Sequence, residues 1–184
     1  MKNILYAAIA ALCIAFTACE KDEIGGTATE ALAGQWYVHV DAVDANGELV
    51  YSDEELYSLG NFLLLTYNAS SNSADTLFVD DLKTFWNFQV KTSCNISAKT
   101  FGNSDYVSNY KYDCGIKLTD GKILNGAATT PSGAAADSIV FYIEFDDDYT
   151  KDEESGEYVY TPELFGFAKY RISGYRYTGL AADD

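Results

Sequence analysis

Short segments in which apolar and polar residues alternate recur along most of this chain. In "WNFQV", Trp86, Phe88 and Val90 occupy every second position, with Asn87 and Gln89 between them. A period of two places such residues on one face of a β-strand. Polar clusters such as "NASSNSAD" and "NGAATTPSGAAAD" separate these segments. The pattern therefore predicts an all-β fold of about eight strands or more.

Composition supports this prediction and narrows the possible partners. The chain has 15 Tyr and 10 Phe but only 1 Met and 2 Pro, a bias toward residues that form strands. Its 184 residues suit one domain with a proper core. The formal net charge of −16 repels phosphate backbones, so we expect no nucleic-acid partner. We predict no cofactor, and the sequence does not indicate which proteins could be partners.

The first residues resemble a bacterial lipoprotein signal. An apolar run, "ILYAAIAALCIAFTA", is shorter than the roughly twenty residues that span a bilayer. Small Ala18 precedes Cys19, as in lipoproteins, although Phe16 stands where leucine is more usual. We predict that residues 1–18 are a signal peptide and that Cys19 is lipidated. The alternative is an ordinary signal peptide cut nearby, which would leave Cys19 as a free thiol.

The residues after Cys19 indicate location and domain boundaries. "EKDE" resembles the surface-export signal of Bacteroidetes lipoproteins, which predicts a lipid-anchored protein of the outer membrane exposed at the cell surface. The periplasmic face of that membrane is the alternative. We interpret residues 19–31 as the lipidated terminus with a flexible tether, because charged and small residues follow there without periodicity. The domain would then comprise residues 32–184.

One stretch, "YSDEELYSLG", predicts a short helix. Ser52 and Glu55 can form a capping box, and Gly60 can end the helix in a left-handed conformation. A helix of about two turns cannot stand alone, so Leu56 and Leu59 should pack on the open end of a sheet. Together, the strands and this helix predict a closed up-and-down antiparallel β-barrel.

Several stretches resemble lipocalins and, more specifically, the lipocalin-like Bacteroidetes lipoproteins catalogued as lipid-binding putative hydrolases. They include "AGQW", "GNFLLLTYN", "FWNFQVKT", "SGYRYTG" and the long "TTPSGAAADSIVFYIEF", and the resemblance runs from about residue 32 to 180. It implies a calycin barrel, a lipid ligand and a Trp36 that plugs the closed end. It also implies that Arg176 stacks over Trp36, provided that no bulge at Gly174 disturbs the alternation.

The leading functional hypothesis is a non-catalytic barrel that binds a small apolar molecule. The predicted lining comprises Trp36, Trp86, Phe88, Val90, Tyr110, Tyr112, Ile116, Phe141, Ile143 and Arg176. The same residues could simply fill the barrel. A carbohydrate-binding protein is an alternative, which would need several exposed Trp or Tyr side chains on one surface. A hydrolase acting on a lipid or an ester is another.

Residues for catalysis or for metal binding are few. The sequence contains no GxSxG nucleophile elbow, and His39, its one histidine, lies on the strand face opposite Trp36. The acidic "DDDYTKDEESGE" has calcium-loop offsets, but Lys151 occupies the glycine position, so we predict a solvated turn. The cysteines and the histidine lack zinc spacing. We therefore predict neither catalytic residues nor a metal site.

Cys94 and Cys114 form an even pair in an extracytoplasmic domain. If residues 102–105 lie near the turn joining their strands, the two cysteines are directly opposite each other. Both also lie on the apolar face of their segments, so we predict a disulfide. Two buried free thiols are the alternative.

Overall fold

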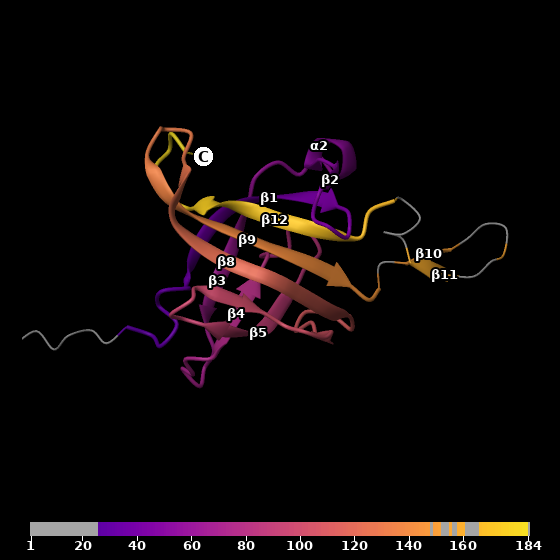
Figure 1. Cartoon of the computed structure of the whole chain (residues 1–184), viewed down its shortest axis with the longest axis horizontal. Helices are drawn as coiled ribbons and strands as arrows, with labels where there is room; N and C mark the ends of the chain where they lie inside the picture. Colours follow the sequence, from indigo (N-terminus) through magenta and orange to yellow (C-terminus); the bar gives the residue numbers. More distant parts are fainter. Residues whose placement is uncertain (1–25, 148, 152–154, 156–157, 161–165, 184) are drawn as a thin grey trace, which may run out of the picture.

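Eight strands pair in a ring and close into a barrel (Figure 1). The computed structural model describes residues 26–147, 149–151, 155, 158–160 and 166–183. The strands of the ring, in their order around the barrel, are β1 (Gly34–Val43), β3 (Phe62–Asn68), β4 (Thr76–Asp80), β5 (Gln89–Asn95), β6 (Thr100–Gly102), β8 (Gly115–Thr129), β9 (Ala135–Phe145) and β12 (Lys169–Arg176). The predicted all-β, lipocalin-like antiparallel barrel is confirmed.

Four further strands lie outside this ring. β2 (Leu49–Tyr51) pairs with β1, and β7 (Val107–Ser108) pairs with β8. β10 (Tyr149–Lys151) and β11 (Tyr158–Tyr160) form a separate two-stranded sheet.

The barrel is closed by the pairing of β1 with β12. Their register runs without a break from Trp36 opposite Arg176 to Val43 opposite Lys169, so no bulge occurs at Gly174. A Cβ atom on Gly174 would lie 2.0 Å from the Tyr37 carbonyl oxygen, closer than any real contact. Closure at this seam therefore depends on a glycine.

The interior is filled by alternate side chains from every strand of the ring. On β1, Trp36, Val38 and Val40 have no exposed surface, whereas Tyr37 and His39 between them point outward and are half-buried. The same alternation on the other strands gives one continuous apolar core. Because the period is two, these inward positions could be predicted from the sequence.

The helix α2 (Asp53–Leu56) is shorter than predicted but begins as predicted. The capping box between Ser52 and Glu55 is present. The helix ends early because the Asp53 carboxylate accepts hydrogen bonds from the backbone N–H groups of Leu59, at 3.2 Å, and Gly60, at 2.7 Å. Leu56 packs against the core, but Leu59 is exposed, so only the former was predicted correctly.

The folded domain begins before the predicted boundary at residue 32. Thr29 is fully buried, and the Ala28 backbone N–H donates to the Asn72 side chain at 2.8 Å. The chain therefore already packs on the barrel at Ala28 and Thr29, whereas Thr27, Glu30 and Ala31 are exposed. The predicted signal peptide and Cys19 lie outside the described residues. Within the described part of the chain, no helix has the length and apolar character needed to cross a membrane.

Candidate functional site

The two ends of the barrel are built differently. Trp36 and its partner Arg176 lie at one end of the β1–β12 ladder, and Tyr170 lies opposite Ala42 toward the other end. We call the first the closed end and the second the mouth. Figure 1 shows α2 and β2 near the same end of the barrel as the last residues of β9.

The closed end is sealed by Trp36 and Arg176. The Trp36 Nε1–H donates to Thr66 Oγ1 at 2.8 Å inside the barrel. The Arg176 guanidinium carbon lies 4.3 Å from the centre of the Trp36 ring, and Nη1 donates to the Ala33 carbonyl oxygen at 3.0 Å. The predicted stacking of Arg176 over Trp36 is confirmed. Such a cation–π contact contributes about 0.5–2 kcal/mol, and here it closes the barrel.

A glycine makes this contact possible. A Cβ atom on Gly34 would lie 2.2 Å from Arg176 Nη1, so any side chain there would displace the guanidinium. The glycine two residues before Trp36 thus allows the close approach of Arg176.

The mouth is covered by aromatic rings, which we call the aromatic lid: Tyr57, Phe85, Trp86, Phe145 and Tyr170. Ring centroids lie 5.1 Å apart for Phe85 and Tyr170, 5.6 Å for Trp86 and Phe145, and 5.6 Å for Tyr57 and Phe85. The hydroxyls of Tyr57 and Tyr170 are 3.0 Å apart and share a hydrogen bond. Phe145 is the last residue of β9 and Tyr170 is the second residue of β12, whereas the other three rings belong to connecting segments.

Asp81 holds the segment that carries two of these rings. Its side chain is fully buried, and its Oδ2 accepts hydrogen bonds from the backbone N–H groups of Phe85, at 3.0 Å, and Trp86, at 2.8 Å. Its Oδ1 accepts from the N–H groups of Lys83, at 3.0 Å, and Phe88, at 2.9 Å. One carboxylate therefore satisfies four donors of the β4–β5 connection and fixes the rings over the mouth.

Most of the predicted lining residues do face the interior, where they pack against one another. Residues with no exposed surface are Trp36, Phe88, Val90, Ile116, Phe141 and Ile143. Trp86 and Tyr112 are half-buried and pack against this core, and Arg176 caps the closed end. Ligand binding by these residues stays a prediction, because in this structure they fill the barrel.

The prediction for Tyr110 is wrong. Its side chain is 59% exposed and lies on the outer face of the barrel, 5.2 Å from the Phe78 ring centre. The predicted strand is interrupted, because β7 ends at Ser108 and β8 begins only at Gly115. Between them, the Asn109 side-chain oxygen accepts the Lys111 N–H at 3.1 Å and turns the chain, so the alternation is lost.

A protein-family model described as "Lipid-binding putative hydrolase" matches residues 21–181, which include the closed end, the interior and the aromatic lid. The chain belongs to this family. A search of curated proteins gives no match. The resemblance to the lipid-binding putative hydrolase family is confirmed, and the matched barrel agrees with the lipid-binding part of the description.

The hydrolase part of the family description can be compared with one cluster on the outer wall. His39 Nε2 lies 3.3 Å from Ser173 Oγ and 3.4 Å from Asp41 Oδ2. Asp41 is also bound by Arg171 Nη2 at 2.8 Å. In a catalytic triad, the serine and the carboxylate contact different ring nitrogens. Here both contact the same nitrogen, so the imidazole cannot take a proton from the serine while the carboxylate orients it.

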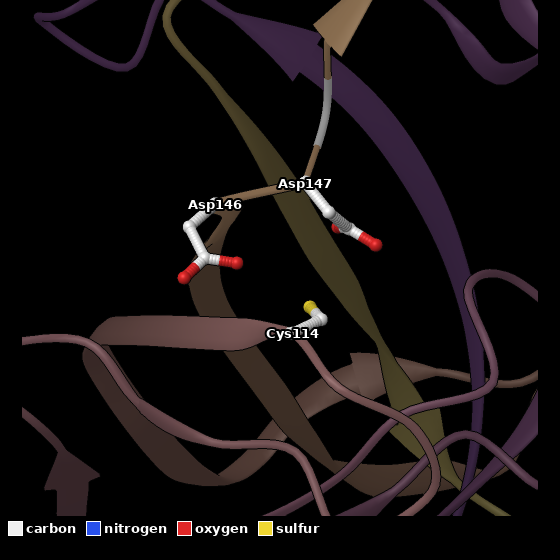
Figure 2. Close-up of side chains that lie close together, drawn as sticks. All are labelled: Cys114, Asp146 and Asp147. Carbon is white, nitrogen blue, oxygen red and sulfur yellow. The ribbon is translucent and has the colours of Figure 1, made fainter.

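A second cluster lies near the mouth and has the spacing of metal ligands. Figure 2 shows Cys114 beside Asp146 and Asp147, and their possible ligand atoms all lie within 4.8 Å of one another. Asp146 Oδ1 already accepts the Gly115 N–H at 2.6 Å. Burial, reinforced by the neighbouring carboxylates, raises the pKa of the Cys114 thiol to about 12. The thiol is therefore a poor nucleophile and, at neutral pH, a protonated partner for the carboxylates.

The predicted disulfide is wrong for this structure. Cys94 and Cys114 are free thiols, and the residue opposite Cys94 is Phe101 on β6. The predicted turn at residues 102–105 was misplaced, because the hairpin of β5 and β6 turns at residues 96–99. Much of the acidic "DDDYTKDEESGE" segment lies outside the described residues.

The sequence did not identify the lid residues Tyr57, Phe85 and Tyr170, nor Asp81. Trp86 was placed correctly toward the interior, but as part of a strand that in fact begins at Gln89. The sequence does contain a signal for this segment: Asp81 follows a strand and directly precedes "LKTFWNF". An aspartate at such a position can bind the backbone N–H groups of a tight connection between strands.

Proposed function

We propose that this protein is a lipid-anchored outer-membrane protein, exposed at the cell surface of a Bacteroidetes bacterium, whose barrel binds one small lipid-like molecule without converting it. The signal-like first residues, Cys19 and "EKDE" support the anchor and the location. Membership of the lipid-binding family supports the ligand class.

The observation that carries the proposal is the contrast between the two ends of the barrel. The closed end is tied by Trp36 and Arg176, both on strands of the ring. At the mouth, Tyr57, Phe85 and Trp86 come from connecting segments. Asp81 holds the backbone of Phe85 and Trp86, so it is the side chains of the lid that can rotate aside without breaking those bonds or the ring of strands. The ligand therefore enters at the mouth and takes the place of lid side chains.

The magnitudes allow such an exchange. Phe85 and Trp86 form four ring pairs with Phe145 and Tyr170. A ring pair contributes about 0.5–1.5 kcal/mol beyond its burial, so separating these four costs about 2–6 kcal/mol. An acyl chain that buries ten methylenes gains about 8 kcal/mol. A long apolar ligand can thus displace the lid, whereas a small polar one cannot.

Non-catalytic binding is supported by the chemistry of the available groups. The Ser173 and Asp41 side chains contact the same nitrogen of His39, and the pKa of the Cys114 thiol is raised. Neither cluster offers an activated nucleophile.

Native mass spectrometry of the purified mature domain tests the ligand. We expect one copurified or added fatty acid per chain, released unchanged on denaturation. Failure to retain any of a panel of fatty acids and sterols would contradict the proposal, and so would turnover of a bound ester.

A separate experiment tests the anchor. We expect incorporation of a palmitate analogue and membrane fractionation, both lost in Cys19→Ala, and removal of the domain by protease added to intact cells. Resistance to the protease until the outer membrane is opened would place the domain on the periplasmic face. Absence of acylation would contradict the anchor and leave the ligand-binding proposal untouched.

A further inference from the structure

Three aromatic side chains lie together on the outside of the barrel. Tyr67 on β3 and Phe78 on β4 are directly opposite each other, with ring centroids 5.5 Å apart and planes inclined by 14°. Tyr110 contacts Phe78 edge-on, at 5.2 Å and 75°. Their neighbours on the same strands, such as Leu77 and Val79, point into the core. The three rings are therefore additional to the core and form an apolar surface beside the solvent.

Polar groups border these rings closely. Asp80 is only 5% exposed, and its Oδ2 accepts the Tyr67 hydroxyl at 3.3 Å and lies 3.4 Å from Lys111 Nζ. Gln89 Nε2 donates to the Tyr67 hydroxyl oxygen. A nearly buried carboxylate, an amide, a phenol and an ammonium group thus meet at the edge of the aromatic surface.

This combination matches one ligand chemistry. A sugar ring has an apolar C–H face, which packs on aromatic rings, and hydroxyls that both donate and accept hydrogen bonds. Lys111 and Gln89 can donate to such hydroxyls, and the Asp80 carboxylate positions the Lys111 ammonium and the Tyr67 hydroxyl beside them. A purely apolar ligand would instead remove water from these polar groups without replacing its hydrogen bonds, which is costly.

The net charge of the chain and the position of the rings on paired strands limit the classes of ligand that can bind there. The net charge of −16 disfavours polyanions such as nucleic acids and acidic polysaccharides. The backbones of β3, β4 and β5 are already paired within the sheet, so this face cannot bind a peptide by adding a strand. Figure 1 shows these three strands side by side in the wall of the barrel.

We propose that Tyr67, Phe78 and Tyr110, with the polar groups of Asp80, Gln89 and Lys111, form a binding site for a neutral carbohydrate. Tyr110, the most exposed of the three rings, contacts the C–H face of one sugar unit and is supported by Phe78 and Tyr67, and the polar side chains bind the sugar hydroxyls. The site lies outside the barrel, so carbohydrate can bind while the interior stays filled. The inference does not depend on the proposed lipid ligand.

Titration of the full mature chain with hexasaccharides of glucose, mannose, galactose and xylose tests this site. We expect at least one to bind with a Kd of about 10 µM to 1 mM. Saturation-transfer NMR should show the strongest effect on C–H protons of one sugar face. Tyr110→Ala should weaken binding at least about tenfold, because it removes the most exposed ring, and Tyr110→Phe should retain it.

Matched variants separate a specific site from a general effect. Tyr106→Ala removes another exposed tyrosine, whose hydroxyl lies 3.4 Å from Glu144 on β9 and not beside Phe78, and should leave binding unchanged. Lys111→Ala should weaken binding, and its melting temperature is measured as well, because this change leaves the nearly buried Asp80 carboxylate without its ammonium partner. No binding to any of the four hexasaccharides, or equal binding by the Tyr110→Ala and Tyr106→Ala variants, would overturn the proposal.

Discussion

Replacing Asp81 with alanine should detach the aromatic lid from the mouth. The carboxylate accepts four backbone hydrogen bonds of 2.8–3.0 Å within the β4–β5 connection. Three residues of this connection, Leu82, Lys83 and Asn87, have positive φ values of 54°, 68° and 49°. Asparagine tolerates such a conformation, but for Leu82 and Lys83 it is unfavourable and persists only while the surrounding bonds hold it.

The expected loss of stability can be bounded from these bonds. A hydrogen bond to a charged acceptor contributes about 1.5–3 kcal/mol, so four independent bonds would contribute about 6–12 kcal/mol. The bonds share one acceptor group, and water can reach Lys83 and Thr84, which are exposed. We therefore expect Asp81→Ala to lower the free energy of unfolding by about 3–5 kcal/mol. Asp81→Asn keeps one acceptor oxygen but points its NH2 group at two backbone N–H donors, so we expect a loss close to that of Asp81→Ala.

Urea titrations at neutral pH, followed by far-ultraviolet circular dichroism and by tryptophan emission, measure this effect. The emission of Trp86 should shift to the red before the strands unfold, because the lid opens first. Asp105→Ala removes an exposed carboxylate in another connection and should change stability by less than about 0.5 kcal/mol. The reasoning is refuted if Asp81→Ala stays within about 1 kcal/mol of the parent protein and its emission maximum does not move.

Three further predictions concern closure, acid stability and the thiols. Gly174→Ala should destabilise the barrel by more than about 3 kcal/mol or prevent folding, because its Cβ would lie 2.0 Å from the Tyr37 carbonyl oxygen; an unchanged urea midpoint would contradict this. Hydrogen bonds lower the pKa of Asp183 to about 2, and the bond from the Thr178 hydroxyl has the largest effect. Because the pKa in the unfolded chain is about 4, the ionised carboxylate stabilises the C-terminal turn fully above that pH. That stabilisation should disappear as the pH falls toward 2, and amide hydrogen exchange in the turn should then become faster. An exchange rate that does not depend on pH, after correction for the intrinsic rate, would argue against this prediction. Cys94 should be alkylated before Cys114 at pH 8, because Cys114 is more buried and its pKa is raised to about 12; a peptide map that links the two cysteines would show instead that they are bridged.

The barrel could be predicted from the sequence because side-chain alternation repeats on strand after strand. Phe88, Val90, Ile116 and Phe141 were placed correctly from that period alone, and the capping box of Ser52 was visible as a local pattern. Each of these features depends on residues close together in the chain.

The errors arose where a polar side chain redirects the backbone. Asn109 interrupts the strand that was expected to carry Tyr110 inward, and Asp53 shortens the helix. A sequence pattern does not show which aspartate or asparagine will bind backbone groups, because the choice depends on tertiary burial. The aromatic lid was missed for the same reason, since Asp81 assembles it from a connection that resembles a strand.

The central claim is that an apolar ligand binds under the lid and near Trp86. Quenching by a brominated fatty acid tests it, because bromine quenches tryptophan only at short range. In Trp36→Phe, where Trp86 is the remaining tryptophan, we predict strong quenching that saturates near one ligand per chain. In Trp86→Phe, which retains Trp36 at the closed end, we predict little quenching. Absence of saturable quenching in Trp36→Phe, or stronger quenching of Trp36 than of Trp86, would contradict the account.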